Sequence, residues 1–197
     1  MIHPETEVQF INRQVGYGVV AKNFIPKGTI TWVLDKFDRE FTTCQYDEFE
    51  DVYKNLLNTY AYKNNLGNLV LCWDNARFVN HSFKSNCLTT AYNFEVAVRD
   101  IYPGEQLTDD YGYLNIDVPF RGIDEGTKRK IVYPDDLLKY YKTWDKKLQE
   151  ALKYLSKVEQ PLKELISEDL WFELLKVEKG DCKMKSILTN YYHQTSL

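Results

Sequence analysis

The sequence lacks a recognisable pattern of metal ligands. It contains 197 residues, of which four are cysteines, Cys44, Cys72, Cys87 and Cys182, and three are histidines. None of these forms a CxxC, CxC or HxxxH pair, whereas zinc ligands usually occur at such close spacings. We therefore expect no zinc site, and four buried or half-buried thiols in a reducing compartment.

The sequence also lacks an excess of basic residues and a long apolar run. The formal net charge is −4, which is not typical of a protein that binds nucleic acid directly. No apolar stretch approaches the ~20 residues that span a bilayer, and the first 14 residues do not resemble a signal peptide. We expect an intracellular protein, cytoplasmic or nuclear, that binds neither membrane nor nucleic acid.

Residues able to form a core are abundant. Apolar residues make up 44% of the chain, including 15 tyrosines and 10 phenylalanines, so an overall disordered state is not expected. Short segments rich in β-branched and aromatic residues predict strands between residues 7 and 34. Two further segments, "LTTAYN" and "FEVAVRDI", predict a hairpin that turns near Asn93.

Two regions have the periodicity of helices. Residues 46–62 carry apolar side chains at three- and four-residue steps, which predicts one helix with one apolar face. From Pro134 onward the chain changes character and becomes helical. The segment after Pro134 places one apolar stripe along a helix, formed by Leu137, Tyr141, Trp144, Leu148, Leu152 and Leu155.

Three separated motifs stand out from these elements. The first is Gly16-Tyr17-Gly18, just before a predicted strand. The second is "RFVNHSFKSNC", residues 77–87, whose polar side chains follow an apolar pair without any period. The third is "VRDIYPGEQLTDDYGY", residues 98–113. Each motif alone is more typical of a turn than of a site.

Together, in this order and spacing, the motifs resemble the SET domain of protein-lysine methyltransferases. The family pattern has GxG, then R-F-x-N-H-S-x-x-P-N, then G-E-E-L-T-x-D-Y. The resemblance implies a mostly β fold with added helices, in which small sheets are joined through a pseudoknot. It implies a SET domain over residues 1–118 with a helical insert at about 46–62, a post-SET-like linker over 119–133, and a helical segment over 134–197 that packs on it.

The resemblance also implies an activity and a cofactor. S-adenosylmethionine would donate a methyl group to a lysine side chain of a histone or another basic protein, leaving S-adenosylhomocysteine. Tyr111 would be the catalytic residue, and the residues that hold the cofactor would be Gly16, Tyr17, Gly18, Arg77, Asn80, His81 and Tyr111. Tyr60 or Tyr62 would line the pocket, with helix core as the alternative, and Arg77 is equally compatible with a structural ion pair.

The sequence departs from the family pattern where many members bind zinc. The expected cysteines are replaced by Phe83, by Gly122 and Asp124, and by the region of Lys128 and Arg129. We expect Phe83 to fill the vacated space, and the helices after Pro134 to cover the cofactor and the lysine channel. The stripe on these helices leaves a homodimer as another possibility.

A second departure lies next to the catalytic position. Asp109 stands where an aromatic residue usually influences how many methyl groups are added, so mono-, di- and trimethylation are not distinguished. The alternative for Asp109 is a side chain that points to solvent. Ser85 replaces a proline of the motif, with little expected effect. The competing function is a SET-like module that binds a peptide or cofactor without catalysis.

Overall fold

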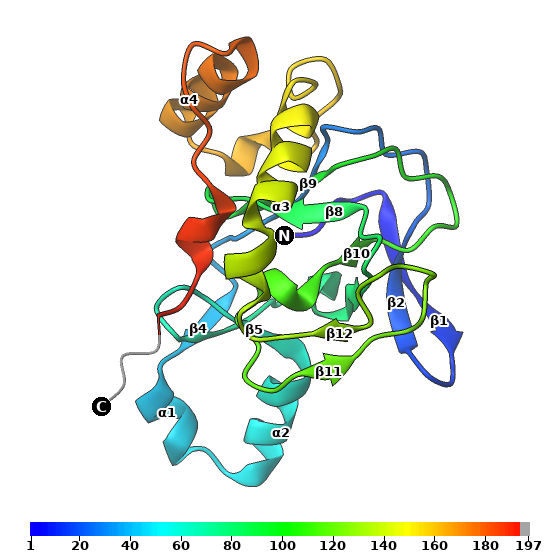
Figure 1. Ribbon diagram of the computed structural model, residues 1–197, viewed down its shortest axis with the longest axis vertical. Helices are drawn as coiled ribbons and strands as arrows, with labels where there is room; N and C mark the ends of the chain where they lie inside the picture. Colours follow the sequence, from blue (N-terminus) through cyan, green and yellow to red (C-terminus); the bar gives the residue numbers. More distant parts are fainter. Residues whose placement is uncertain (194–197) are drawn as a thin grey trace.

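Small sheets and short helices alternate in the computed structural model, which describes residues 1–193 (Figure 1). Within these residues the strands form five sheets of two or three strands. The two-stranded sheets pair β1 (Thr6–Asn12) with β2 (Gly16–Ala21), β7 (Asn80–His81) with β10 (Thr108–Asp109), and β11 (Phe120–Arg121) with β12 (Ile131–Val132). The three-stranded sheets have the orders β3 (Ile30–Val33)–β9 (Phe94–Ala97)–β8 (Cys87–Thr89) and β4 (Arg39–Phe41)–β6 (Leu69–Leu71)–β5 (Ala61–Lys63). This mostly β architecture with a helical C-terminal part is the fold class expected from the sequence.

Two hairpins form, and the one that turns near Asn93 was predicted from the sequence. Strands β1 and β2 pair antiparallel, and the chain enters β2 at Gly16 with a φ of 81°, a conformation that glycine adopts without steric cost. Strands β8 and β9 pair antiparallel around Asn93, whose φ is 60°. Asparagine is one of the few other residues that tolerate this region.

The helical insert differs from the prediction. Instead of one helix over 46–62, the chain forms α1 (Thr43–Glu48) and α2 (Asp51–Tyr60), and then enters β5. Thr42 begins α1 early through a capping box with Gln45, and the extended backbone of Phe49 ends it. The apolar face is also not a core face, because only Leu57 of α2 is buried.

Two segments that are distant in the sequence pack side by side through β7 and β10, and we call this place the crossing. Strand β7 runs parallel to β10, with Asn80 opposite Thr108 and His81 opposite Asp109. Asn86 fastens the crossing, because its side-chain amide donates to the Gln106 carbonyl at 2.7 Å and its amide oxygen accepts from Thr108 N at 2.8 Å. The crossing brings the second and third sequence motifs side by side.

The C-terminal segment contains α3 (Asp136–Leu152), η3 (Lys163–Leu165), α4 (Glu168–Lys179) and η4 (Ile187–Asn190). Figure 1 shows α3 in yellow beside β8 and β9. Leu137, Trp144 and Leu148 share one buried core with Leu88 and Phe94 of that sheet. The predicted stripe is therefore part of the chain's own core, and a homodimer through it stays a prediction. Residues 194–197 of the predicted segment lie outside the described residues.

No helix among residues 1–193 is both long enough and apolar enough to cross a membrane.

Candidate functional site

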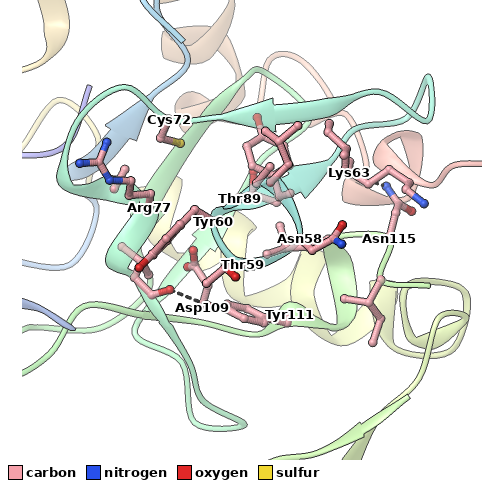
Figure 2. A pocket seen from close by; sticks show the side chains of 18 of the residues that line it. Asn58, Thr59, Tyr60, Lys63, Cys72, Arg77, Thr89, Asp109, Tyr111 and Asn115 are labelled. Carbon is pink, nitrogen blue, oxygen red and sulfur yellow. Dashed lines mark hydrogen bonds between the residues drawn. The ribbon is translucent and has the colours of Figure 1, made fainter. Parts of the chain in front are cut away.

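A cavity of about 470 Å³ opens between the helical insert and the segment that follows Tyr111 (Figure 2). Its wall on one side is the end of α2 and β5, which includes Tyr60 and Tyr62. The opposite wall is formed by residues 114–118 and Phe120. Both tyrosines thus line the cavity, as expected for at least one of them, and neither belongs to a buried helix core.

Tyr111 lies in the wall of this cavity. Its hydroxyl donates to the Val79 carbonyl at 2.6 Å, drawn as a dashed line in Figure 2, and its backbone N–H donates to His81 Nδ1 at 3.2 Å. Burial, reinforced by Asp109 and then Glu95, raises the pKa of Tyr111. The phenol therefore stays neutral near pH 7, and its oxygen is held in one place at the first residue of η2 (Tyr111–Tyr113).

Asp109 does not point to solvent, and this alternative from the sequence was wrong. The residue is only 5% exposed and lines the cavity beside Tyr111 (Figure 2). Its carboxyl lies within hydrogen-bonding reach of the carboxyl of Glu95, which projects from β9 into the same cavity. Burial raises the pKa of Asp109 to about 6. Burial and the neighbouring Asp109 raise the pKa of Glu95 well above its usual range.

Several of the residues predicted to hold the cofactor lie together on another face of the crossing. Asn80 Nδ2 donates to the Tyr17 carbonyl at 2.9 Å and to Gln106 Oε1 at 3.2 Å. A Cβ atom on Gly18 would lie 2.5 Å from Gln106 Oε1 and 2.7 Å from Asn80 Nδ2. A residue other than glycine at this position would force these side chains to shift. None of these residues, nor Gly16, lines the cavity that contains Tyr111.

His81 lies between the group of residues around Asn80 and the cavity that contains Tyr111. Its ring packs against Phe83, Tyr111 and Phe120, with ring centroids 4.5, 5.5 and 5.3 Å away. Burial lowers the pKa of His81, while Asp110 acts in the opposite sense. Because Nδ1 accepts from Tyr111 N, the neutral ring carries its proton on Nε2. Within the described residues, Nε2 is buried and has no hydrogen-bond partner.

Arg77 is exposed, although its side chain contributes to the lining of the cavity. Its guanidinium donates to the Trp73 carbonyl at 3.1 Å and lies over the Phe78 ring, 5.2 Å from the centroid. In the part of the chain that the structure describes, Arg77 makes no ion pair. The structural ion pair considered for it from the sequence does not form there.

The positions that the resemblance assigns to zinc ligands meet in space. A Cβ on Gly122 would lie 2.7 Å from the Phe83 ring, and the Arg129 guanidinium lies 4.9 Å from the centroid of that ring. Arg129 also pairs with Asp110 and, at 2.5 Å, with Asp136 at the start of α3. Phe83 therefore occupies the expected space, and an arginine connects the surrounding segments.

The helices after Pro134 do not cover the cavity. Its lining ends at Phe120 and includes no residue from α3 or α4. The segment of residues 114–120 takes this place, so the prediction that the C-terminal helices close the lysine channel was wrong. The C-terminal helical segment instead holds residues 114–120 from the side away from the cavity, because Asn115 Nδ2 donates to the carbonyl of Asn190 in η4 at 2.8 Å.

A comparison with protein-family models finds the SET domain over residues 16–112. The chain belongs to the SET domain family. The match begins at the GxG motif and ends just after Tyr111, so it includes all three motifs noted in the sequence. Among curated proteins, no sequence matches the chain.

Three functional features of this SET domain were missed from the sequence. Glu95 looked like an ordinary outward-facing strand residue, because it alternates with buried Phe94 and Val96. Arg129 lies in a linker without any periodicity, so no signal marked its role. The wall over residues 114–120 could have been found, because apolar residues recur at every second position from Leu114 to Phe120.

Proposed function

We propose that this SET domain is a protein-lysine methyltransferase that uses S-adenosylmethionine. The observation that carries the proposal is the neutral Tyr111, fixed at the wall of a cavity lined by aromatic side chains and placed directly beside His81. The cofactor, when bound, supplies a methyl group on a positively charged sulfur. The residues of this chain would bind it, orient the acceptor amine and exclude water.

Two features support cofactor binding at the crossing of β7 and β10. The backbone at Gly18 is approached so closely that a Cβ would displace the side chains of Asn80 and Gln106, and His81 Nε2–H is a buried donor without a partner within residues 1–193. Buried donors are rarely left unpaired in native proteins. We propose that Gly16, Tyr17, Gly18 and Asn80 hold the amino-acid end of the cofactor, and that His81 contacts its adenine.

The cavity beside Tyr111 suits a lysine side chain. Trp32 and Tyr62 pack edge to face with their ring centroids 6.1 Å apart, and both line the cavity. Such walls bury the four methylene groups of lysine and disfavour a charged amine by desolvation. The Tyr111 hydroxyl would orient the amine, and orientation alone contributes several kcal/mol or more to a displacement reaction.

We propose a basic protein as the substrate and an intracellular location, cytoplasmic or nuclear. The net charge of −4 favours encounter with a positively charged chain. The four cysteines are free, which suits a reducing compartment. Cys72 and Cys87 are buried but Cys44 and Cys182 are exposed, so the expectation of four buried or half-buried thiols was wrong.

A calorimetric titration of S-adenosylmethionine into the purified protein tests the cofactor. We expect saturable binding that is lost in His81→Ala and kept in His193→Ala, a matched change at an exposed histidine. Transfer of labelled methyl groups to cell-extract proteins then tests catalysis. It should fall sharply in Tyr111→Phe and persist in Tyr102→Phe. Binding without transfer would favour the non-catalytic module, and no binding would contradict the proposal.

A further inference from the structure

Two carboxyl groups face each other in the cavity without a cation of the chain between them. Asp109 comes from β10 and Glu95 from β9, and both line the cavity that contains Tyr111. Among the described residues, no lysine or arginine pairs with either carboxyl. Asp109 Oδ1 is buried and has no hydrogen-bond partner within residues 1–193. A buried, unpaired acceptor of this kind requires an explanation.

A structural role explains the pair poorly. Even the single negative charge that remains when the pair shares one proton is unfavourable to bury unless a cation or several donors compensate it. The Tyr113 hydroxyl lies within hydrogen-bonding reach of Asp109, but no cation does this for the pair among the described residues. Elsewhere in this chain buried carboxyls have such compensation, since Asp110 and Asp136 both pair with Arg129. The pair of Glu95 and Asp109 instead faces the cavity, where a ligand can reach it. Perturbed carboxyls in a cavity are typical of functional sites.

The surroundings define what this acidic pair would accept. Trp32, Tyr62 and Tyr111 line the same cavity, so a ligand there meets aromatic walls and an anionic end. An alkyl chain that ends in a positive nitrogen matches both parts. The ammonium group would also be attracted to the faces of the aromatic rings.

We propose that Glu95 and Asp109 form the receptor for the ammonium group of the substrate lysine, and that the pair accepts its proton before methyl transfer. This inference rests on the proposed function and adds a proton acceptor to it. The pair, holding one shared proton and one negative charge, first binds the ammonium. One N–H bond then breaks and one O–H bond forms, so that a neutral amine faces a neutral acid pair.

Burial makes this proton transfer less unfavourable than it is in water. In water the proton would stay on lysine, because its pKa of ~10.4 exceeds that of a carboxyl by about six units. Burial favours the neutral form of both partners, lowering the pKa of the amine and raising that of the carboxyl. In this cavity burial already raises the pKa of both carboxyls. The difference between their pKa values and that of the lysine amine is therefore smaller than in water.

Neighbouring groups would not mask the titration of the pair. The ionisable groups that face it are Tyr62, Cys72, Cys87, Tyr111, Tyr113, Asp110 and the amino group of Met1. Burial raises the pKa of the three tyrosines and of the two thiols, so these five stay neutral near pH 7. The Met1 amino group is paired with Asp35 at 2.8 Å.

The first experiment measures ammonium binding without cofactor or transfer. n-Butylammonium, which mimics the lysine side chain, is titrated into the full chain and followed by nuclear magnetic resonance, with n-butanol as the neutral comparison. We expect saturable shifts at residues of the cavity for n-butylammonium, and binding that strengthens as the pH rises through about 6. Replacing both carboxyls, as Glu95→Gln with Asp109→Asn, should weaken it about tenfold or more, whereas Glu150→Gln should not.

The second experiment measures the proton step. In the pH profile of single-turnover methyl transfer at saturating substrate, Asp109→Asn should lower the turnover rate and shift the rising limb of the profile to higher pH. The isosteric amides keep the size of the side chains, and circular dichroism checks the folding of each variant. If the double variant does not fold, the single variant Asp109→Asn, which removes the charged member of the pair, gives the same comparison.

The outcomes separate this inference from the proposed function. Equal binding of n-butylammonium to wild type and variant, or equal binding of n-butanol, would overturn the receptor. An unchanged pH profile in an active Asp109→Asn enzyme would overturn the proton acceptor and leave the methyltransferase intact. Pair-dependent binding of n-butylammonium by a protein that transfers no methyl group would support the receptor and overturn the proposed function.

Discussion

Replacing Arg129 should be among the most damaging single changes in this protein. The guanidinium is 17% exposed and pairs with Asp110 and Asp136, whose side chains are 3% and 1% exposed. It also lies over the rings of Phe83 and Tyr140, 4.9 and 4.6 Å from their centroids. Arg129→Met keeps much of the apolar volume and leaves two buried carboxylates without a cation.

The size of the effect follows from this burial. Removing one partner of a buried ion pair typically costs about 3–5 kcal/mol, because the remaining charge is left uncompensated. Two remaining donors limit the loss, since Asp110 accepts from Gly112 N at 3.1 Å and Asp136 from Tyr133 N at 3.0 Å. We therefore expect a loss of about 3 kcal/mol in the free energy of unfolding, or roughly 10 °C in melting temperature for a chain of this size.

Urea unfolding followed by circular dichroism measures this loss, with Lys139→Met as the matched control. Lys139 pairs with Asp135 on the surface, where both side chains are 50% exposed, and such pairs contribute less than about 1 kcal/mol. In the double variant Arg129→Met with Asp136→Asn, part of the stability should return. A loss below about 1 kcal/mol for Arg129→Met would refute the reasoning that this arginine holds the linker to the domain.

Three further predictions concern the site. Tyr111→Phe should keep the fold but lower methyl transfer about 100-fold, measured as initial rates with labelled cofactor; equal rates would remove Tyr111 from the catalytic step. Gly18→Ala should lose cofactor binding in calorimetry, because its Cβ would lie 2.5 Å from Gln106 Oε1; normal affinity would contradict the close approach. Asp109→Asn should raise the free energy of unfolding at pH 8 by about 3 kcal/mol and leave it nearly unchanged at pH 4. Folding raises the pKa of Asp109 from 3.8 to about 6, so the stability linked to its protonated form is complete below pH ~4 and is lost as the pH rises through about 6. Equal effects at both pH values, in melts followed by circular dichroism, would contradict this burial cost.

The sequence contained enough information to bring the motif residues together. The motifs at 77–87 and 98–113 contain Asn86 and Thr108, whose mutual hydrogen bond fastens the crossing. The stripe from Leu137 to Leu152 predicted the buried face of α3 because a packed helix has the same period as its pattern. Local patterns of this kind identify an element and one of its faces.

Whether a side chain is buried or exposed depended on which other segments pack against its helix or strand, and the sequence does not show this. The apolar periodicity of α2 was real, but it lies above a cavity, so Val52 and Tyr53 are 68% and 54% exposed. Glu95 has the alternation of a solvent-facing strand residue, although that face of β9 is covered by other segments. Long-range packing of this kind leaves no local trace, which is why the acidic pair was missed even though Asp109 had been noted.

The arginine cluster attaches the post-SET-like linker to the rest of the domain. Related domains that bind zinc bring a cysteine after the Asn-His-Ser motif together with cysteines of the linker. Here Arg129, in the linker, contacts Phe83 after that motif, Asp110 beside Tyr111, and Asp136 in α3. A guanidinium can do this because its five donors lie in one plane and its faces stack on aromatic rings.

Glu125 adds a second connection between the linker and the domain, because its carboxylate accepts from Ser82 Oγ at 2.7 Å and from Phe83 N at 2.8 Å. Because arginine stays charged at any physiological pH and does not react with oxidants or chelators as thiolate zinc sites do, the linker of this chain should stay attached under conditions that release zinc from its relatives.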